Sequence, residues 1–178
     1  MAGHVVLVGM MGSGKSTVGR IVADRMRRPF HDSDADVARR CGQSIPAIFA
    51  SRGEAAFRQD ERAAVGCLLA SSVPAVISLG GGAVIDPETR RRLRADGVVV
   101  WLDVAPDALA ARLGDGTGRP LIEADLIGAL RRLDAMRRPV YGALADIVIN
   151  AGSRRPAVLA EAVVREVRSR PDGAGSSR

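Results

Sequence analysis

The residues with the clearest chemistry lie between Gly9 and Thr17, where the chain reads Gly-Met-Met-Gly-Ser-Gly-Lys-Ser-Thr. This order fits the Gly-x-x-x-x-Gly-Lys-Ser pattern of a phosphate-binding loop. Its glycines let the backbone approach phosphates and point successive N–H groups at them, because no Cβ is in the way. Lys15 supplies a positive charge to the outer phosphates, and the Ser16 hydroxyl can ligate the Mg²⁺ that accompanies them. The predicted nucleotide-binding residues of the loop are Gly12, Ser13, Gly14, Lys15, Ser16 and Thr17.

The flanking sequence favours a phosphate-binding loop over an ordinary glycine-rich turn. The apolar run at residues 5–8 predicts a buried strand before the loop, and apolar residues at helical spacing predict a helix over residues 16–27 after it. A helix that begins at the loop favours negative charge, because its free N–H groups and its dipole point at the ligand. Lys15 is also the only lysine in an arginine-rich chain. We therefore expect a bound nucleoside triphosphate.

Two carboxylates, Asp32 and Asp34, follow a short predicted strand. Such a pair can serve as a helix N-cap with a solvated turn. Beside a phosphate loop it can also do chemistry, because one carboxylate can sit in the outer shell of the magnesium while the other accepts a hydrogen bond from the hydroxyl to be phosphorylated. We assign Asp32 to the metal and Asp34 to the acceptor.

Glycines and an arginine extend this candidate site. The run Gly80-Gly81-Gly82 ends a predicted strand and permits close approach of the backbone to a ligand, although it can also be a plain loop. Arg58 alone would more often be a surface residue, but Glu61 lies three residues further along the same helical face and can hold its guanidinium. Guanidinium groups suit planar carboxylates and transferring phosphoryl groups.

Strands and helices alternate along the chain, which predicts an α/β fold with a parallel sheet covered on both faces. The predicted strands are residues 5–8, 29–31, 75–79, 98–102 and 147–149, and the predicted helices are residues 16–27, 35–40, 45–50, 54–70, 87–95, 106–113, 124–138 and 156–167. Residues 114–118 read as a flexible break. Ligands of such sheets bind beyond the C-terminal ends of the strands, where the phosphate loop, the aspartates and the glycine run should meet.

Length and composition indicate one globular domain. The chain has 178 residues, of which 47% are hydrophobic and 26% charged, and no run is long enough to cross a membrane or to act as a signal peptide, so we expect a cytoplasmic protein. Cys41 and Cys67 lack metal-ligand spacing and are expected to be reduced. The net charge of +6 leaves nucleic acid as an alternative partner. Scattered arginines and few aromatic residues argue against it.

In several signatures the sequence resembles shikimate kinase. They are the phosphate loop, Asp32-Ser33-Asp34, Ser44-Ile45 with Ile48-Phe49, Gly53-Glu54 with Phe57-Arg58 and Glu61, Leu79 to Ala83, Arg119-Pro120-Leu121, and Arg137 with Pro139 and Tyr141. Together they span about residues 4–167 and keep the order of the family. Positions that depart from the family pattern include Val37-Ala38-Arg39 and Gly142, none of which we use for chemistry.

The resemblance implies a fold, a reaction and roles for named residues. The fold is a P-loop three-layer α/β/α sandwich with a central parallel five-stranded sheet, within a single domain of residues 1–168 that has a helical substrate-binding region at about 33–61 and a mobile lid at about 112–125; a disordered tail follows at 169–178. The reaction transfers the ATP γ-phosphoryl group to the 3-hydroxyl of shikimate, with one Mg²⁺ per subunit held by Ser16 and Asp32. Lys15, Asp34 and Arg119 are the implied catalytic residues. Shikimate would contact Asp34, Arg58, Gly80, Gly81, Gly82 and Arg137, and ATP would contact Arg112, Arg119 and Arg154 besides the loop.

Other classes of protein fit less well. A regulatory GTPase needs an Asn-Lys-x-Asp motif, but Lys15 is the only lysine and Asn150 the only asparagine. Another P-loop small-molecule kinase, such as a gluconate or nucleoside monophosphate kinase, is the main alternative. The combination of Asp34, Arg58 and Arg137 favours a compact carboxylated polyol over a nucleobase. We expect a monomer that uses ATP and shikimate, with neither a nucleic acid nor a membrane as partner. Either Arg154 or its neighbour Arg155 can be the arginine beside the adenine of ATP. Asp34 either removes the proton of the acceptor hydroxyl or only orients that hydroxyl.

Overall fold

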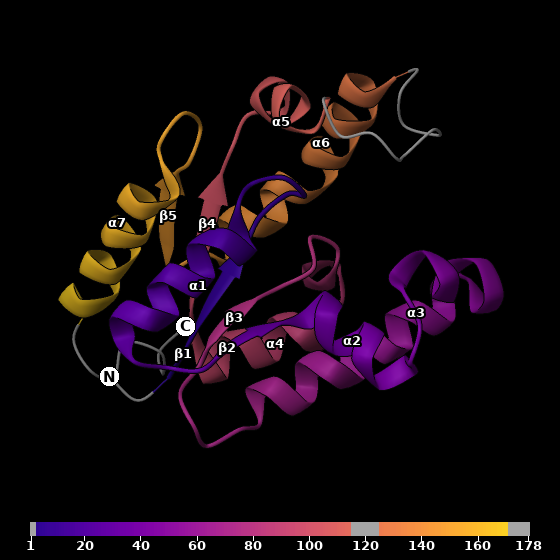
Figure 1. Cartoon of the computed structure of the whole chain (residues 1–178), viewed down its shortest axis with the longest axis horizontal. Coiled ribbons are helices and arrows are strands. Elements are labelled where there is room, and N and C mark those ends of the chain that lie inside the picture. The colour runs from indigo at the N-terminus through magenta and orange to yellow at the C-terminus, as the bar shows by residue number, and fades with distance from the viewer. Residues whose placement is uncertain (1–2, 115–124, 171–178) are drawn as a thin grey trace.

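The computed structural model describes residues 3–114 and 125–170. In these ranges the apolar runs form one sheet in which every strand pair is parallel, in the order β2-β3-β1-β4-β5 (Figure 1). The strands are β1 (His4–Val8), β2 (Phe30–Asp32), β3 (Val76–Ser78), β4 (Gly97–Asp103) and β5 (Ile147–Asn150).

Strand β1 lies at the centre of the sheet, which explains its unbroken apolar sequence. It pairs with β3 on one side and with β4 on the other, so that Val6 stands opposite both Ile77 and Val99. All of its residues are buried, as expected of a parallel strand covered on both faces. The chain turns to one side of β1 for β2 and β3 and to the other side for β4 and β5. Ligands of open α/β sheets bind at such a switch point.

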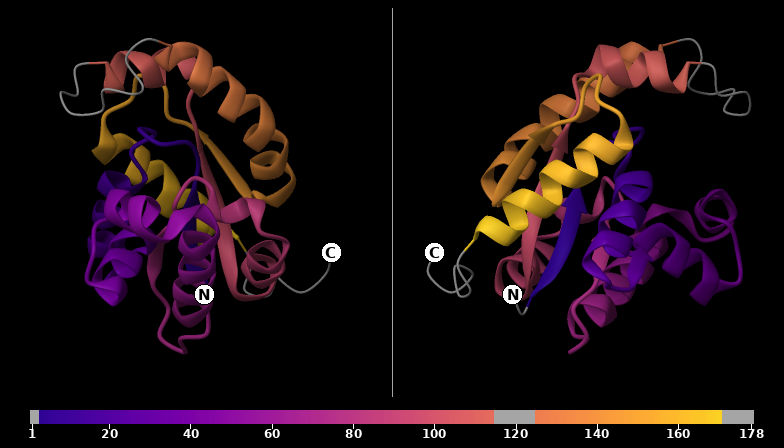
Figure 2. Two further views of the ribbon diagram at one scale, coloured as in Figure 1. Left: turned by 90° about the vertical axis from the view of Figure 1, so that its right-hand side faces the viewer. Right: turned by 60° about the vertical axis from the view of Figure 1, so that its left-hand side comes forward.

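Helices cover both faces of the sheet (Figure 2). Helices α1 and α7 pack together on one face, and α4 and α6 contact β4 on the other. The helices are α1 (Lys15–Met26), α2 (Ser33–Cys41), α3 (Ile45–Leu69), α4 (Pro87–Asp96), α5 (Pro106–Leu113), α6 (Leu126–Leu144) and α7 (Pro156–Ser169), with a short 3₁₀ helix, η1 (Ala83–Ile85). The predicted three-layer α/β/α sandwich with a central five-stranded parallel sheet is therefore confirmed.

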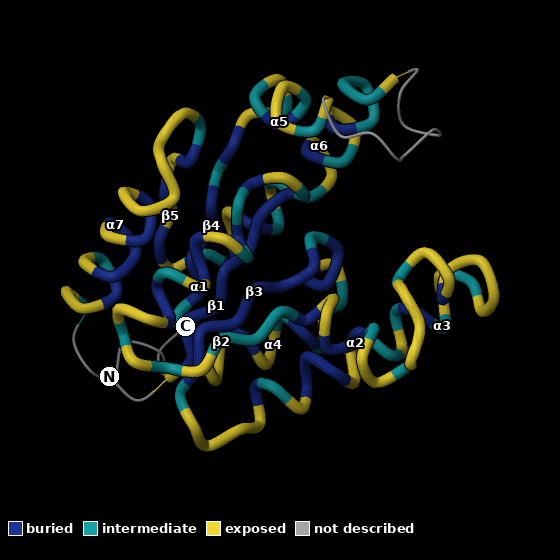
Figure 3. Tube along the Cα trace, in the orientation of Figure 1, coloured by how far each residue is buried: buried dark blue, intermediate teal, exposed yellow. Residues whose placement is uncertain are grey.

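Burial follows this layering, with β1 and β3 dark blue at the centre (Figure 3). The main core lies between the sheet and its helices. A second, smaller cluster lies between α2 and α3, which project beyond β2 (Figure 1), and consists of Val37, Ile48, Phe57 and Ala64. The projecting pair of helices thus has apolar contacts of its own, which fix the helices that carry Asp34, Arg58 and Glu61.

Helix α3 is interrupted at Gly53. The φ of 77° and ψ of 174° at this residue lie outside the helical region, in a conformation open almost only to glycine. A Cβ on Gly53 would meet nothing within 4 Å, so the backbone conformation rather than a lack of space requires glycine here. The predicted division into helices at 45–50 and 54–70 is confirmed.

Helix α6 is longer than the sequence predicts. The expected end at Arg138 was wrong, because the helix continues through Pro139 to Leu144. A proline inside a helix costs about 3 kcal/mol. The buried side chains of Tyr141 and Leu144 extend the apolar face of the helix, and burying such side chains contributes about 1.5–3 kcal/mol each, which offsets that cost.

Smaller differences have local causes. Helix α2 begins at Ser33 rather than at Ala35, since the Asp32 side chain accepts the N–H groups of Asp34 and Ala35 and caps the helix. The 3₁₀ helix η1 was not predicted. Helix α7 extends to Ser169, and Arg170 pairs with Asp146 at 3.1 Å, at the start of the stretch assigned to a tail.

Two predicted segments lie wholly or largely outside the described residues. They are the lid at about 112–125, of which residues 115–124 with Arg119 are not described, and residues 171–178 of the tail. In the described parts, no helix is both long enough and apolar enough to span a membrane.

Candidate active site

The phosphate loop joins β1 to α1, and its glycines have the backbone conformations that the sequence predicts. Gly9, Gly12 and Gly14 have φ values of 143°, 76° and 92°, a region that favours glycine. A Cβ on Gly9 would also lie only 2.7 Å from the carbonyl oxygen of Leu102 in β4. Gly14 caps α1, and the exposed Thr17 lies in its first turn. The loop therefore ends at a helix N-terminus, as an anion site requires.

Lys15 is buried beneath this loop. Its Nζ donates hydrogen bonds to the carbonyl oxygens of Gly9 and Met10, each at 2.9 Å. Burial lowers the pKa of Lys15 to about 8, although the nearby Asp34 and Asp32 carboxylates oppose the shift. A phosphate anion would favour the charged amine.

Ser13 carries the second buried polar group of the loop. Among the described residues, its hydroxyl has no hydrogen-bond partner. Leaving a buried hydroxyl unpaired costs about 1–3 kcal/mol. A phosphate oxygen bound by the loop would remove that cost, so the loop fits a phosphate ligand.

Ser16 and Asp32 meet at the C-terminal end of β2. The Ser16 hydroxyl donates to Asp32 Oδ2 at 2.5 Å and lies 3.3 Å from the Ser78 hydroxyl. Asp32 Oδ1 accepts the N–H of Asp34 at the same time, so the predicted role of Asp32 as a helix N-cap is confirmed. The described residues include no group of three or more His, Cys, Asp or Glu side chains that could hold a metal alone. Hydroxyl and carboxylate oxygens beside a phosphate site nonetheless fit Mg²⁺, which is usually bound by few side chains together with phosphates.

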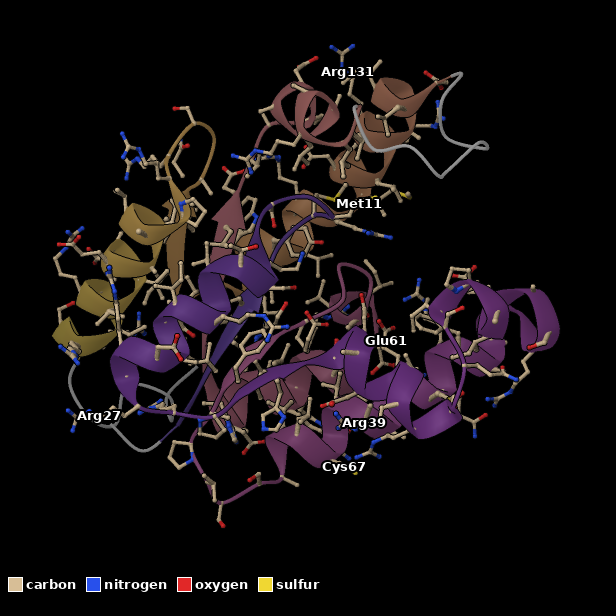
Figure 4. The ribbon with its side chains drawn as sticks, in the orientation of Figure 1. Met11, Arg27, Arg39, Glu61, Cys67 and Arg131 are labelled. Carbon is tan, nitrogen blue, oxygen red and sulfur yellow. The ribbon has the colours of Figure 1, made fainter. Side chains whose placement is uncertain are left out.

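The loop Gly80–Gly82 follows β3 and lies against two carboxylates. A Cβ on Gly80 would lie 2.8 Å from Glu61 Oε1 and would also collide with the Asp34 carboxylate. In Figure 4, Glu61 marks α3, and Met11 marks the phosphate loop. Glycine at position 80 is therefore what lets both carboxylates approach the main chain.

Two guanidinium groups complete the cluster. A Cβ on Gly82 would lie 2.6 Å from Arg58 Nη1, and one on Gly81 would lie 3.3 Å from Arg137 Nη1. The same position on Gly81 is 3.3 Å from the carbonyl oxygen of Gly9 in the phosphate loop. The glycine loop thus lies between the two arginines and the phosphate loop.

Arg58 is held in place by two carboxylates of its own helix. Its guanidinium donates to Glu61 at 2.8 Å and to Glu54 at 3.1 Å. Glu61 is buried, which raises the pKa of its carboxyl group, while the charge of Arg58 opposes that rise. The predicted pairing of Arg58 with Glu61 is confirmed.

Of the two aspartate charges that act on Lys15, that of Asp34 has the larger effect on the lysine pKa. Partial burial raises the pKa of Asp34, and the charge of Asp32 adds to the rise, whereas Lys15 and Arg58 lower it. A raised pKa makes a carboxylate a better proton acceptor, because basicity follows pKa. The group is thus suited to accept a proton from a hydroxyl, or to hold that hydroxyl by a hydrogen bond.

A cavity of about 680 Å³ opens beside the arginine pair. Its walls come from α3, from η1 and the start of α4, and from α6. Arg58, Glu61, Gly82 and Arg137 line one side of it. A small carboxylated molecule therefore has room to reach both guanidinium groups.

Residues further along the chain border the nucleotide side. Arg112 in α5 donates to the carbonyl oxygens of Gly12, Ala151 and Gly152, so it ties the phosphate loop to the segment after β5. Arg154 is exposed on that segment. Arg112 thus contacts the phosphate loop. Arg154 lies on the segment after β5 that Arg112 binds, but no described contact joins Arg154 to the phosphate loop.

Two polar residues of this site were missed by the sequence analysis. The buried Ser33 accepts the Gly80 N–H at 2.8 Å, and the buried Tyr141 donates its hydroxyl to the Gly81 carbonyl oxygen at 2.7 Å. Ser33 was overlooked between two aspartates, and Tyr141 lay beyond the expected end of its helix. Tyr141 stood in the signature with Arg137 and Pro139, but no role of its own was assigned to it from the sequence.

The parallel sheet, the phosphate loop at its central strand and the charged cluster beside that loop define a P-loop small-molecule kinase. A family model described as shikimate kinase matches residues 11–168. The chain belongs to the shikimate kinase family, whose members are ATP-dependent phosphotransferases.

Individual relatives agree with this assignment. A shikimate kinase of Pseudomonas paraeruginosa is 39% identical over 94% of this chain and 98% of its own length, and one of Pseudomonas syringae pv. syringae is 43% identical over 86% and 89%. The solved structure of the shikimate kinase from Acinetobacter baumannii in complex with shikimate has a TM-score of 0.88 at 32% identity and covers 95% of this chain and 94% of that one. A gluconokinase from Sinorhizobium meliloti, with a TM-score of 0.64 and 23% identity, shares the fold.

Proposed function

We propose that the chain transfers the γ-phosphoryl group of ATP to the 3-hydroxyl of shikimate. The observation that supports this most is the position of the glycine loop 80–82, which has Asp34, Arg58 and Arg137 around it and the phosphate loop at 3.3 Å from the Cβ position of Gly81. A carboxylated polyol held by the arginines would thus lie next to a bound triphosphate.

The phosphate loop and its neighbours would hold the donor. The loop N–H groups, Ser13 and Lys15 would bind the phosphates, and Arg112 and Arg154 would border the nucleotide. Ser16 and Asp32 would hold one Mg²⁺, which neutralises charge on the phosphates. Lys15 and Arg119 would stabilise negative charge that spreads over the phosphoryl oxygens during transfer.

The charged cluster would hold the acceptor. Arg58 and Arg137 would bind the carboxylate through planar, charge-assisted hydrogen bonds, and the glycine loop would contact the substrate through its backbone. Asp34 would orient the acceptor hydroxyl and take its proton, because it lies between the glycine loop and the phosphate loop. A lid at about residues 112–125 would exclude water and so protect ATP from hydrolysis.

The organisation that we infer is a single domain at residues 1–168, with an acceptor-binding region at about 33–61. It would act as a monomer in the cytoplasm, where ATP is available. Light scattering of the purified protein would test the oligomeric state.

An activity assay tests the reaction. Purified protein with Mg²⁺ and ATP should release ADP when shikimate is added, and ³¹P NMR should show a new phosphate monoester. Equal turnover without shikimate, or turnover with gluconate only, contradicts the proposal.

A matched pair of arginine variants tests the placement of the acceptor. Arg58→Ala should raise the KM for shikimate, whereas Arg52→Ala should leave it unchanged, because Arg52 lies on the same helix but pairs with Asp60 and is not among the described residues that line the cavity. An effect of Arg58→Ala on ATP alone would show that the carboxylate binds elsewhere.

A further inference from the structure

The backbone of the loop Gly80–Gly82 has unusual conformational freedom, which contacts with neighbouring residues must restrict. The peptide between Gly81 and Gly82 has a glycine on each side, so its plane can rotate without a Cβ to oppose it. Gly82 itself has an ordinary φ of −93° and ψ of −15°, which any residue can adopt. Glycine stands at these positions because it leaves room for the charged side chains around the loop. The lack of a Cβ also leaves the peptide free to rotate.

Hydrogen bonds hold each carbonyl of this loop in a different way. The Gly80 carbonyl accepts the N–H of Ala83, and the Gly82 carbonyl accepts the N–H of Ile85, both at 3.0 Å within the 3₁₀ turn. The Gly81 carbonyl accepts the hydroxyl of Tyr141 at 2.7 Å. The middle peptide is therefore held by a side chain from a distant helix, whereas its neighbours are held by the local backbone.

We propose that Tyr141 is a positioning residue for the acceptor: its hydroxyl fixes the Gly81–Gly82 peptide and the Arg137 guanidinium beside it. The inference rests on the proposed function and deepens it. The peptide is trans, so fixing its carbonyl toward Tyr141 directs the Gly82 N–H to the opposite side. The Arg58 guanidinium also lies beside Gly82, 2.6 Å from its Cβ position.

The surroundings of Tyr141 suit this task. The side chain is fully buried, and its ring lies 5.8 Å from that of Trp101. The Cβ position of Gly81 is 3.5 Å from the Tyr141 hydroxyl and 3.3 Å from Arg137 Nη1. Burial raises the pKa of Tyr141 to about 12, while Arg137 opposes the rise. The hydroxyl therefore keeps its proton, and remains a donor, over the working pH range.

The test compares phenylalanine variants of two aromatic residues that are neighbours in space, Tyr141 and Trp101. Tyr141→Phe removes only the hydroxyl, and we expect the KM for shikimate to rise about 3-fold to 10-fold, which corresponds to the loss of one hydrogen bond, with the KM for ATP unchanged. Trp101→Phe alters the packing on the same ring but keeps the hydroxyl, so the KM for shikimate should stay the same. An equal rise in both variants, or no rise in Tyr141→Phe, overturns the proposal.

Two measurements without turnover separate this proposal from the proposed function. In Tyr141→Phe, the amide groups of Gly81 and Gly82 should show new μs–ms exchange by NMR relaxation dispersion, even if the protein phosphorylated a different acceptor. In the unaltered protein, 3-fluorotyrosine labels this one tyrosine, and its ¹⁹F resonance should shift when shikimate is added. Unchanged dynamics in the variant, or an unchanged resonance at saturating shikimate, contradicts the role of Tyr141.

Discussion

Gly82→Ala should weaken acceptor binding while leaving the fold intact. The φ and ψ of Gly82 suit alanine, so the backbone carries no strain. The new Cβ would lie 2.6 Å and 2.9 Å from the two terminal nitrogens of Arg58, and the guanidinium must move because it is the mobile end of its side chain. Moving it breaks the 2.8 Å bond to Glu61 and removes one partner of the substrate carboxylate.

The size of the effect follows from the bond that is lost. A hydrogen bond to a charged group contributes about 1.5–3 kcal/mol, so the KM for shikimate should rise about 10-fold to 150-fold. The free energy of unfolding should fall by only about 1–2 kcal/mol, because the guanidinium is partly exposed and Glu61 can regain some solvation. Steady-state kinetics with each substrate varied in turn, together with thermal unfolding, measure both quantities.

Gly142→Ala is the matched control. This glycine is exposed on α6, and its Cβ would make an ordinary contact of 3.8 Å with Trp101. The substitution should stabilise the helix by up to about 1 kcal/mol and leave the KM for shikimate unchanged. If Gly82→Ala kept a normal KM for shikimate, the reasoning that places the carboxylate at Arg58 would be refuted.

Three further outcomes are expected. Asp34→Asn should lower kcat by about 100-fold or more while ATP binding changes little, and a near-normal kcat would remove its catalytic role. Nucleotide affinity should fall as the pH rises through about 8, because Lys15 then loses the charge that binds phosphate. Calorimetry at pH 8.5 in buffers of different ionisation enthalpy should detect proton uptake when the nucleotide binds. No proton uptake would exclude a neutral Lys15 in the free protein. Gly53→Ala should lower the free energy of unfolding by about 1–3 kcal/mol through backbone strain alone, so an unchanged melting temperature would show that the kink relaxes at no cost.

The sequence predicted the parts of the site whose chemistry is local. The phosphate loop, the strand ends and the Arg58–Glu61 pair depend on short-range patterns, so residue type and spacing were enough to identify them. The two-part helix α3 was found for the same reason, since Gly53 marks its own boundary.

Other parts depend on contacts between distant segments. The end of α6 was misplaced because the cost of Pro139 is visible in the sequence, whereas the burial of Tyr141 against the sheet is not. The hydrogen bonds from Ser33 to Gly80 and from Tyr141 to Gly81 join residues that only the fold brings together. Ser33 and Tyr141 stand in recognised signatures, but nothing in the sequence names the backbone groups that they bind.

The central place of β1 has a consequence for synthesis of the chain on the ribosome. This strand is made before β3 and β4, which are its two partners among the described residues. Synthesis must therefore proceed through β4, to Asp103, before both edges of β1 are covered. Until then an apolar strand presents unpaired N–H and C=O groups, which is a template for aggregation, and non-local parallel pairing forms slowly. The strand that leads into the phosphate loop thus stays open to non-native pairing until both partner strands have been made.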